Sequence, residues 1–577
     1  MKNAWRLQIL LLIAVSWLAF LEIRLHSKSV VANEQQLNNS VASIASQPLT
    51  EAARVELQGI IQIAYLSDLH RPSFKRFQKD VADFYATTGD RLPWLDNGKP
   101  TAQARAIIAA LKHAGYKGLS PEDYDASAWD QRVARLDSRS GVSEAELLRF
   151  DIALSVSTIR YISDKHLGRV NPNLYHSALD VGSTTLSLAQ FLQEKLVASD
   201  DVPGALKSLE PPIPPYQRTL AALRRYIESA YANNWQPLPI TKKPVKPDDE
   251  YDAVPQLAQL LTLLGDLPQS AQALQTDHYS GDLVNAVKRF QDRHGLASNG
   301  QLDAATFAEL NTPLSVRVTQ LQPALERWRW LPHQFARPPI VVNIPEFQLH
   351  AIDDQDQSAF VMKIVVGKAL GHETPVLASA IDAVIFRPEW VVPYSIQTKE
   401  LIPDIKRKPG YLAKNSYEIV DHKGNVVSDS DVSPEMLKEL RSGQLAIRQK
   451  PGPNNSLGLV KFEFPNQYDV YMHGTPAMSL FSRTRHDFSH GCIRVEDPQK
   501  LAEWVLKDIP EWTPEKIRAA MDGDETVRVK VARPVPVLIL YTTALASPDG
   551  EVRFFSDLYG LDAKLAEELA HEYDWPQ

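Results

Sequence analysis

The stretch YMHGTPAMSLFSRTRHDFSHGCIRV, residues 471–495, contains Cys492, the single cysteine of the 577-residue chain. A cysteine acts as a nucleophile in its thiolate form, so the side chain needs a base or a positive charge nearby. This stretch contains three histidines, of which His473 and His490 are the candidates for the base, and it places Arg494 two positions after the cysteine. The pattern therefore predicts a cysteine-based acyl-transfer site.

The spacing of the two histidines suggests which one is the base. His473 follows a β-rich segment, 462–472, so a strand and the loop after it can return this residue to the thiol. His490 is the alternative, but it stands only two residues before Cys492, and such a short spacing is rigid. Gly491 lets backbone amides approach a substrate oxyanion closely. We therefore expect His473 to activate the thiol.

The pattern His473-Gly474 followed by Ser489-His490-Gly491-Cys492-Ile493-Arg494 closely resembles the signature of the L,D-transpeptidase catalytic domain, the YkuD-type fold. The resemblance extends over residues 341–540 and includes Gly367, Thr374-Pro375 and the segment 390–396. The whole layout is similar to that of the large YcbB-like members. It implies a multi-domain α+β protein: a mainly helical N-terminal scaffold, a three-helix peptidoglycan-binding module, and a β-rich catalytic domain with an inserted cap subdomain.

The resemblance also implies a role for each residue of the motif. Cys492 would attack the carbonyl of the third residue of a peptidoglycan stem peptide and release the terminal D-alanine. His473 would be the general base. The backbone carbonyl of Gly474 would orient His473, in place of the carboxylate of a conventional triad. Carbapenems are implied as acylating inhibitors.

The remaining candidates surround the thiol. The resemblance implies that the amides of Gly491 and Cys492 form the oxyanion hole, and that His490 and Arg494 support the charge and shape of the site. The residues expected in the substrate groove are Tyr471, Trp390 and Ser489. For the two aromatic residues, a plain role in the hydrophobic core remains open. No metal and no cofactor are expected.

Changes in composition and periodicity divide the chain. Helical spacing of apolar residues is strong in 101–112, the proline-rich run 237–249 indicates a boundary, and β-branched residues dominate from 340 onward. The expected domains are a signal peptide or signal anchor (1–32), a tether (33–50), a helical scaffold (51–245), a peptidoglycan-binding-like domain (250–315), the catalytic domain (338–540) with its cap (397–449), and a C-terminal extension (541–577).

The N-terminus is typical of a targeting segment. Lys2 and Arg6 precede an apolar run, 7–21, that fits a secretory signal and is short for a membrane span. Val30-Val31-Ala32 offers a cleavage site, although charged residues separate it from the apolar run. A cleaved signal and an uncleaved inner-membrane anchor both remain open. In either case we expect an exported protein of the periplasm or cell envelope.

A second motif begins in the segment 283–296. Its residues Ala286-Val287, Phe290-Gln291 and His294-Gly295-Leu296, followed by Gly300 and Leu302, resemble the three-helix peptidoglycan-binding domain. The resemblance implies that the cell wall is a partner. A helical spacer without affinity for the wall is the alternative.

Several other function classes are disfavoured by composition. The net charge is −8 and no Lys/Arg-rich tract is present, so we expect no nucleic-acid partner. One cysteine cannot form an intramolecular disulfide or a multi-thiolate zinc site. H-E-x-x-H, S-x-x-K and Walker A motifs are absent from the sequence.

These observations predict a cysteine L,D-transpeptidase that forms 3→3 cross-links between peptidoglycan stem peptides, donor and acceptor, in cell-wall biogenesis and the maintenance of cell shape. The same nucleophile could instead pass the acyl group to water, as an L,D-carboxypeptidase, or could attach or release a lipoprotein. A non-catalytic wall-binding protein is the alternative from another class. The sequence leaves the acceptor and the oligomeric state open.

Overall fold

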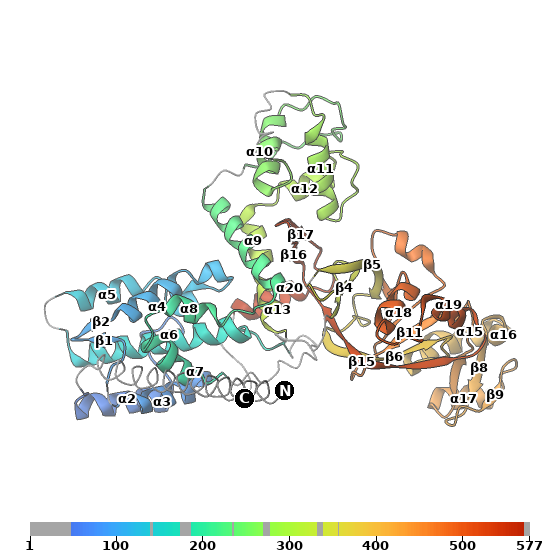
Figure 1. The fold of residues 1–577 in the computed structure, drawn as a ribbon, viewed down its shortest axis with the longest axis horizontal. Helices are drawn as coiled ribbons and strands as arrows, with labels where there is room; N and C mark the ends of the chain where they lie inside the picture. The colour runs from blue at the N-terminus through green and yellow to red at the C-terminus, as the bar shows by residue number, and fades with distance from the viewer. Residues whose placement is uncertain are drawn as a thin grey trace, which may run out of the picture. The chain divides into compact units, whose positions relative to one another are not determined.

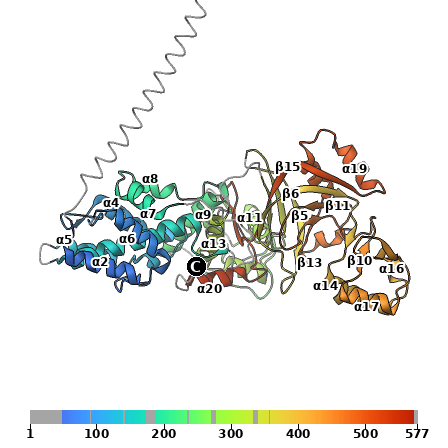
Figure 2. The same cartoon turned by 90° about the horizontal axis from the view of Figure 1, so that it is seen from below.

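The computed structural model describes residues 48–89, 91–138, 142–172, 186–232, 236–268, 277–331, 339–355 and 357–570 (Figures 1 and 2). The predicted N-terminal targeting segment lies outside these residues. The chain forms two compact units, one from residues up to 169 with 186–210, and one from 170–172 with 211–570. No helix among the described residues is long and apolar enough to cross a membrane.

The first unit is helical and is built around α6 (Glu144–Leu167). This helix begins at a capping box, in which Ser143 and Glu146 each bond the other's backbone N–H. Most of its length is buried, so its polar side chains need partners inside the unit; Lys165 pairs with Glu210 at 2.5 Å. The other elements are α2 (Glu51–Ile63), η1 (Lys75–Phe77), α3 (Gln78–Thr87), β1 (Leu95–Asp96), β2 (Lys99–Pro100), α4 (Ala102–Lys112), η2 (Ala114–Lys117), η3 (Pro121–Tyr124), α5 (Trp129–Asp137), α7 (Leu188–Phe191), η5 (Leu192–Val197) and α8 (Val202–Lys207).

The second unit begins with α9 (Pro214–Tyr231), which packs beside α13 (Leu314–Arg329). The expected scaffold range, 51–245, thus includes a helix that belongs to the second unit. Between α9 and α13 the chain forms a three-helix module, α10 (Val254–Leu264), α11 (Asp282–Arg293) and α12 (Ala304–Leu310). These helices match the predicted ones and share one hydrophobic core. The buried Gln291 ties the loop after α11 to α12, because its amide bonds the Gly300 N–H, the Gln301 carbonyl and the Thr306 hydroxyl.

A nine-stranded sheet forms the catalytic domain, in the order β13-β5-β14-β12-β11-β6-β15-β3-β4. A further pairing of β4 with β5 closes eight of these strands into a barrel. The β-rich fold predicted from residue 340 onward is confirmed. The strands are β3 (Ile340–Asn343), β4 (Gln348–Ile352), β5 (Ser358–Gly367), β6 (Leu377–Phe386), β11 (Val460–Glu463), β12 (Met472–His473), β13 (Asp487–Ser489), β14 (Ile493–Val495) and β15 (Val527–Leu540), with the helices η8 (Met478–Ser482), α18 (Pro498–Leu506) and α19 (Pro514–Asp522).

The cap is an insertion with its own sheet, β7-β10-β8-β9, and its own apolar core. It begins earlier than the expected residue 397, because Trp390 already pairs with Gln449 in this sheet. Gln397 is buried inside the cap, where it bonds the carbonyls of Leu440 and Leu445 and the Ile447 N–H. The elements are β7 (Trp390–Val391), α14 (Tyr394–Ile396), η7 (Gln397–Leu401), α15 (Ile402–Arg407), α16 (Tyr411–Lys414), β8 (Tyr417–Val420), β9 (Val426–Ser428), α17 (Pro434–Ser442) and β10 (Ala446–Gln449).

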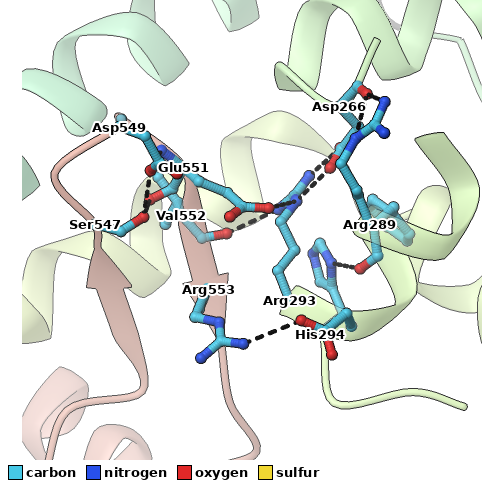
Figure 3. A network of polar contacts seen from close by, with 12 residues as sticks. Asp266, Arg289, Arg293, His294, Ser547, Asp549, Glu551, Val552 and Arg553 are labelled. Atoms are coloured by element: carbon cyan, nitrogen blue, oxygen red, sulfur yellow. Dashed lines mark hydrogen bonds and ion pairs between the residues drawn. The ribbon is translucent and has the colours of Figure 1, made fainter. Parts of the chain in front are cut away.

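After β15 the chain forms a hairpin, β16 (Ala544–Ala546) and β17 (Val552–Phe554), and then α20 (Leu561–Ala570). The hairpin lies against the three-helix module (Figure 3). Arg293 is buried in the module, pairs with Asp266 through two contacts of 2.8 and 2.5 Å, and donates to the Val552 carbonyl at 2.8 Å. This arginine therefore joins the module to the C-terminal segment.

Candidate active site

The pairing of β12 with β14 brings the predicted histidine to the cysteine loop. These strands are parallel, with Met472 opposite Ile493 and His473 opposite Arg494. Cys492 immediately precedes β14, so the 19-residue separation in sequence becomes a neighbouring position across the sheet. On its other side β12 pairs with β11, where Lys461 lies opposite His473. Two cationic side chains therefore flank the histidine.

The Cys492 thiol is partly buried, and its described polar partners lie in the segment just before β12. Sγ lies 3.9 Å from the Asp469 carbonyl oxygen, and the thiol also interacts with the Tyr471 hydroxyl. Among the residues that the structure describes, no hydrogen bond joins Sγ to the His473 ring. Burial raises the pKa of the Cys492 thiol, against the smaller lowering effects of Tyr471, Lys461 and Arg494. The resting residue is therefore a neutral thiol.

His473 is buried, with only 5% of its surface exposed. Burial, assisted by the Arg494 charge, lowers the pKa of His473 to about 3, so its imidazole is neutral. Nδ1 lies 2.5 Å from the Gly474 carbonyl oxygen. A carbonyl can only accept, so Nδ1 carries the proton and Nε2 keeps its lone pair. This tautomer is the one that a general base requires.

Gly491 has a φ of +118°, a conformation that L side chains rarely adopt. Its N–H donates to Ser489 Oγ at 3.1 Å, and that hydroxyl donates to the Cys492 carbonyl at 2.5 Å. Its own carbonyl accepts from Thr374 Oγ1 at 2.8 Å. Ser489, expected in the substrate groove, is buried and braces the turn around the nucleophile.

Comparison with known proteins identifies the domains of the chain. Residues 337–537 match the family model of the L,D-transpeptidase catalytic domain. The chain contains an L,D-transpeptidase catalytic domain. Residues 250–310 match the "Putative peptidoglycan binding domain", and residues 79–223 match the model called Scaffold domain. The family resemblance seen in the sequence is therefore confirmed for residues 337–537 and for residues 250–310, and these domains imply a location in the cell envelope.

One relative is a protein of Haemophilus influenzae described as a "Putative L,D-transpeptidase". It is 30% identical over 226 residues, which are 39% of this chain and 45% of that protein. The chain thus matches less than half of the length of this relative.

In the L,D-transpeptidase domain His490 points to the cap. Its Nε2 lies 2.7 Å from Glu400 Oε1 in η7, and its ring makes an edge contact with the His372 ring at 4.7 Å. Half of the Glu400 side chain is exposed. The sequence gives no signal for Glu400, because it lies in an insertion with no motif around it. His372 likewise has no distinctive spacing.

The other predicted residues lie on two sides of the thiol. Arg494 is largely buried, its Nε has no hydrogen-bond partner among the described residues, and burial lowers its pKa. Its charge acts on both Cys492 and His473. Tyr471 lies between Lys461, whose Nζ is 4.2 Å from the ring centroid, and Trp390 of the cap. Burial, followed by the Cys492 thiol, raises the pKa of Tyr471 well above its usual range.

Nothing in the described part of the chain suggests a metal centre: no group of three His, Cys, Asp or Glu side chains there is arranged to hold an ion. The chemistry available to this site is proton transfer between a thiol and a neutral imidazole, with backbone N–H groups beside them. Such a site can perform acyl transfer.

Proposed function

We propose that the protein is a cysteine L,D-transpeptidase that forms 3→3 cross-links between peptidoglycan stem peptides. The observation that carries this proposal is the His473–Cys492 arrangement within an L,D-transpeptidase domain: a neutral imidazole with Nε2 unprotonated, beside a thiol that precedes β14. A general base of this kind serves acyl transfer without a pre-formed thiolate.

In the first half-reaction the thiol turns from Asp469 toward His473. Nε2 takes the thiol proton as Sγ attacks the carbonyl carbon of the third stem residue. The Cys492 amide stabilises the resulting oxyanion; the Gly491 amide, expected to share this role, already donates to Ser489 Oγ in the structure. The bond to the terminal D-alanine then breaks, and the imidazolium returns its proton to the leaving amine. The product is a thioester on Cys492 and free D-alanine.

In the second half-reaction an amine on the side chain of another stem peptide attacks the thioester. His473 takes the proton that this amine loses, the C–S bond breaks, and the proton returns to the thiolate. The new amide is the cross-link, and the enzyme is restored. Lys461 and Arg494 keep positive charge beside the sulfur while it is anionic, which supports both steps.

The cap would favour an amine over water as acceptor. The cap contacts His490 through Glu400 and Tyr471 through Trp390, and these contacts lie on both sides of the nucleophile. A cap in this position holds the peptide and limits the access of water. The peptidoglycan-binding module would keep the protein on its substrate, and the N-terminal segment would export it, either cleaved or as an inner-membrane anchor.

The test is to incubate the protein with wall that carries tetrapeptide stems and to analyse the muropeptides by mass. We expect cross-linked dimers that have lost one D-alanine, and none with Cys492→Ala. Release of D-alanine without dimers would replace this proposal with an L,D-carboxypeptidase activity. Dimers formed by a correctly folded Cys492→Ala variant would refute the nucleophile.

A further inference from the structure

The peptide group between Gly491 and Cys492 is held from one side by Thr374. Thr374 is buried, and its Oγ1 donates to the Gly491 carbonyl oxygen at 2.8 Å. In a planar trans peptide the C=O and the following N–H point in opposite directions. A bond that fixes the Gly491 carbonyl therefore also fixes the direction of the Cys492 N–H. Glycine alone would leave this direction loosely determined, because its backbone adopts many conformations.

Thr374 is itself held at the base of a tight loop. Its Oγ1 accepts the Gly367 N–H at 2.9 Å, which directs the hydroxyl proton to Gly491. A side chain at Gly367 would meet the His372 carbonyl oxygen at 1.8 Å, so the two ends of the loop lie in close contact.

Tyr559 closes the same loop from the C-terminal segment, beyond the end of the family match at residue 537. Its hydroxyl donates to the Gly367 carbonyl at 2.7 Å and accepts the Thr374 N–H at 3.3 Å. The Tyr559 ring stacks on Tyr541 with centroids 5.6 Å apart. Tyr541 in turn accepts the Tyr559 N–H at 2.8 Å and donates to Asp557 at 2.5 Å. One hydroxyl thus bridges both ends of the loop.

We infer that Thr374 and Tyr559 are positioning residues that aim the Cys492 N–H at the oxyanion, so that the C-terminal segment completes the catalytic site. This inference rests on the proposed acyl transfer at Cys492. Neither side chain contacts the thiol in the described structure. Their effect passes through the Gly491–Cys492 peptide, so it should concern the formation of a tetrahedral oxyanion and leave the thiol's own reactivity unchanged.

Two reactions of the same sulfur distinguish an effect on the oxyanion from an effect on the reactivity of the thiol. Acylation by a carbapenem such as meropenem passes through an oxyanion, whereas alkylation by iodoacetamide is a displacement at a saturated carbon and forms none. Loss of a complete oxyanion donor costs a factor of about 10² to 10³. For a donor that is present but poorly directed, in Thr374→Val and Tyr559→Phe, we expect acylation to slow by roughly tenfold to a hundredfold, with alkylation within about twofold of the wild-type rate.

Matched controls exist in the chain. Thr542→Val removes another buried hydroxyl that donates to a carbonyl at 2.8 Å, and Tyr279→Phe removes a tyrosine hydroxyl that donates to a glycine carbonyl at 2.7 Å in the three-helix module. Both should acylate normally, and Thr374→Ser should restore the rate. Tyr559→Phe keeps the stacked ring, so it carries the test if Thr374→Val does not fold.

Equal acylation in the wild type and in Tyr559→Phe would overturn this inference alone. So would a parallel loss of acylation and alkylation, because that would mean that the cysteine itself had moved. A wild-type protein that is alkylated at Cys492 but never acylated would instead overturn the proposed function.

Discussion

The protonation of the Cys492–His473 pair leads to a prediction about pH. Burial raises the pKa of the thiol above its ordinary value of 9.0, and burial lowers the pKa of His473 to about 3. Because the pKa of the thiol is raised above its ordinary value, little of the thiol is ionised at pH 7. The resting pair is therefore thiol and imidazole, in contrast to the thiolate–imidazolium pair of some cysteine enzymes.

Two pH profiles should differ as a result. Iodoacetamide reacts with the thiolate, so alkylation should rise about tenfold for each pH unit between pH 6 and 8.5. Acylation by a carbapenem uses His473 as base. Because the folded pKa of this group is lowered, it stays unprotonated as pH falls through the ordinary histidine range, and acylation should be flat from pH 5 to 8.

Variants connect each profile to its residue. His473→Ala should slow acylation by roughly two to four orders of magnitude, as expected for loss of a general base, and should leave the slope of the alkylation profile intact. Arg494→Met removes a charge that lowers the pKa of the thiol, so its alkylation profile should move to higher pH. Intact-mass kinetics measures both reactions. An alkylation rate that is already constant between pH 5 and 7 would refute the neutral pair.

Two further predictions concern the cap and the three-helix module. Glu400→Gln weakens the contact with His490, so the ratio of cross-linked to hydrolysed muropeptides should fall while iodoacetamide still labels Cys492. Glu439→Gln, at an exposed position of the same cap, is the control. An unchanged ratio in Glu400→Gln would exclude a role for this contact. Arg293→Met leaves Asp266 buried without its partner, which should cost about 3–5 kcal/mol in urea unfolding of the full chain. Adding Asp266→Leu should recover much of this loss. An Arg293→Met variant as stable as the wild type would contradict the role of Arg293 as the partner of a buried carboxylate.

The sequence predicted the elements whose periodicity is local. The helices of the three-helix module could be recognised because leucines recur at helical spacing before Gly265, and because α11 carries its own motif. The closure of the barrel could not be predicted this way. It depends on β4 pairing with β5 and on β15 lying between β6 and β3, which are long-range choices that no local pattern encodes.

The limits of the cap show the same difference. Trp390 was expected to lie in the substrate groove, before an insertion that began at residue 397. In the structure it pairs with Gln449, 59 positions later, and so it belongs to the cap sheet while also facing Tyr471. A two-residue strand leaves almost no trace in composition, because two positions cannot establish an alternating pattern.

The two histidines show why distance along the sequence is a poor guide to catalytic geometry. His490 is close to Cys492 in the chain, yet its ring faces Glu400 and His372, because the Gly491 turn and the bonds of Ser489 direct it outward. His473 is far away in the chain, yet parallel pairing of β12 and β14 sets it beside the same loop. The sheet explains why the distant histidine is the one beside the thiol loop. The strand register places His473 across from Arg494, whereas the turn at Gly491 separates the side chains of His490 and Cys492. Of the two residues that we infer to aim the backbone, Thr374 was part of the family resemblance but had no role assigned, and Tyr559 gave no signal, because both act on a peptide group and their own chemistry is unremarkable.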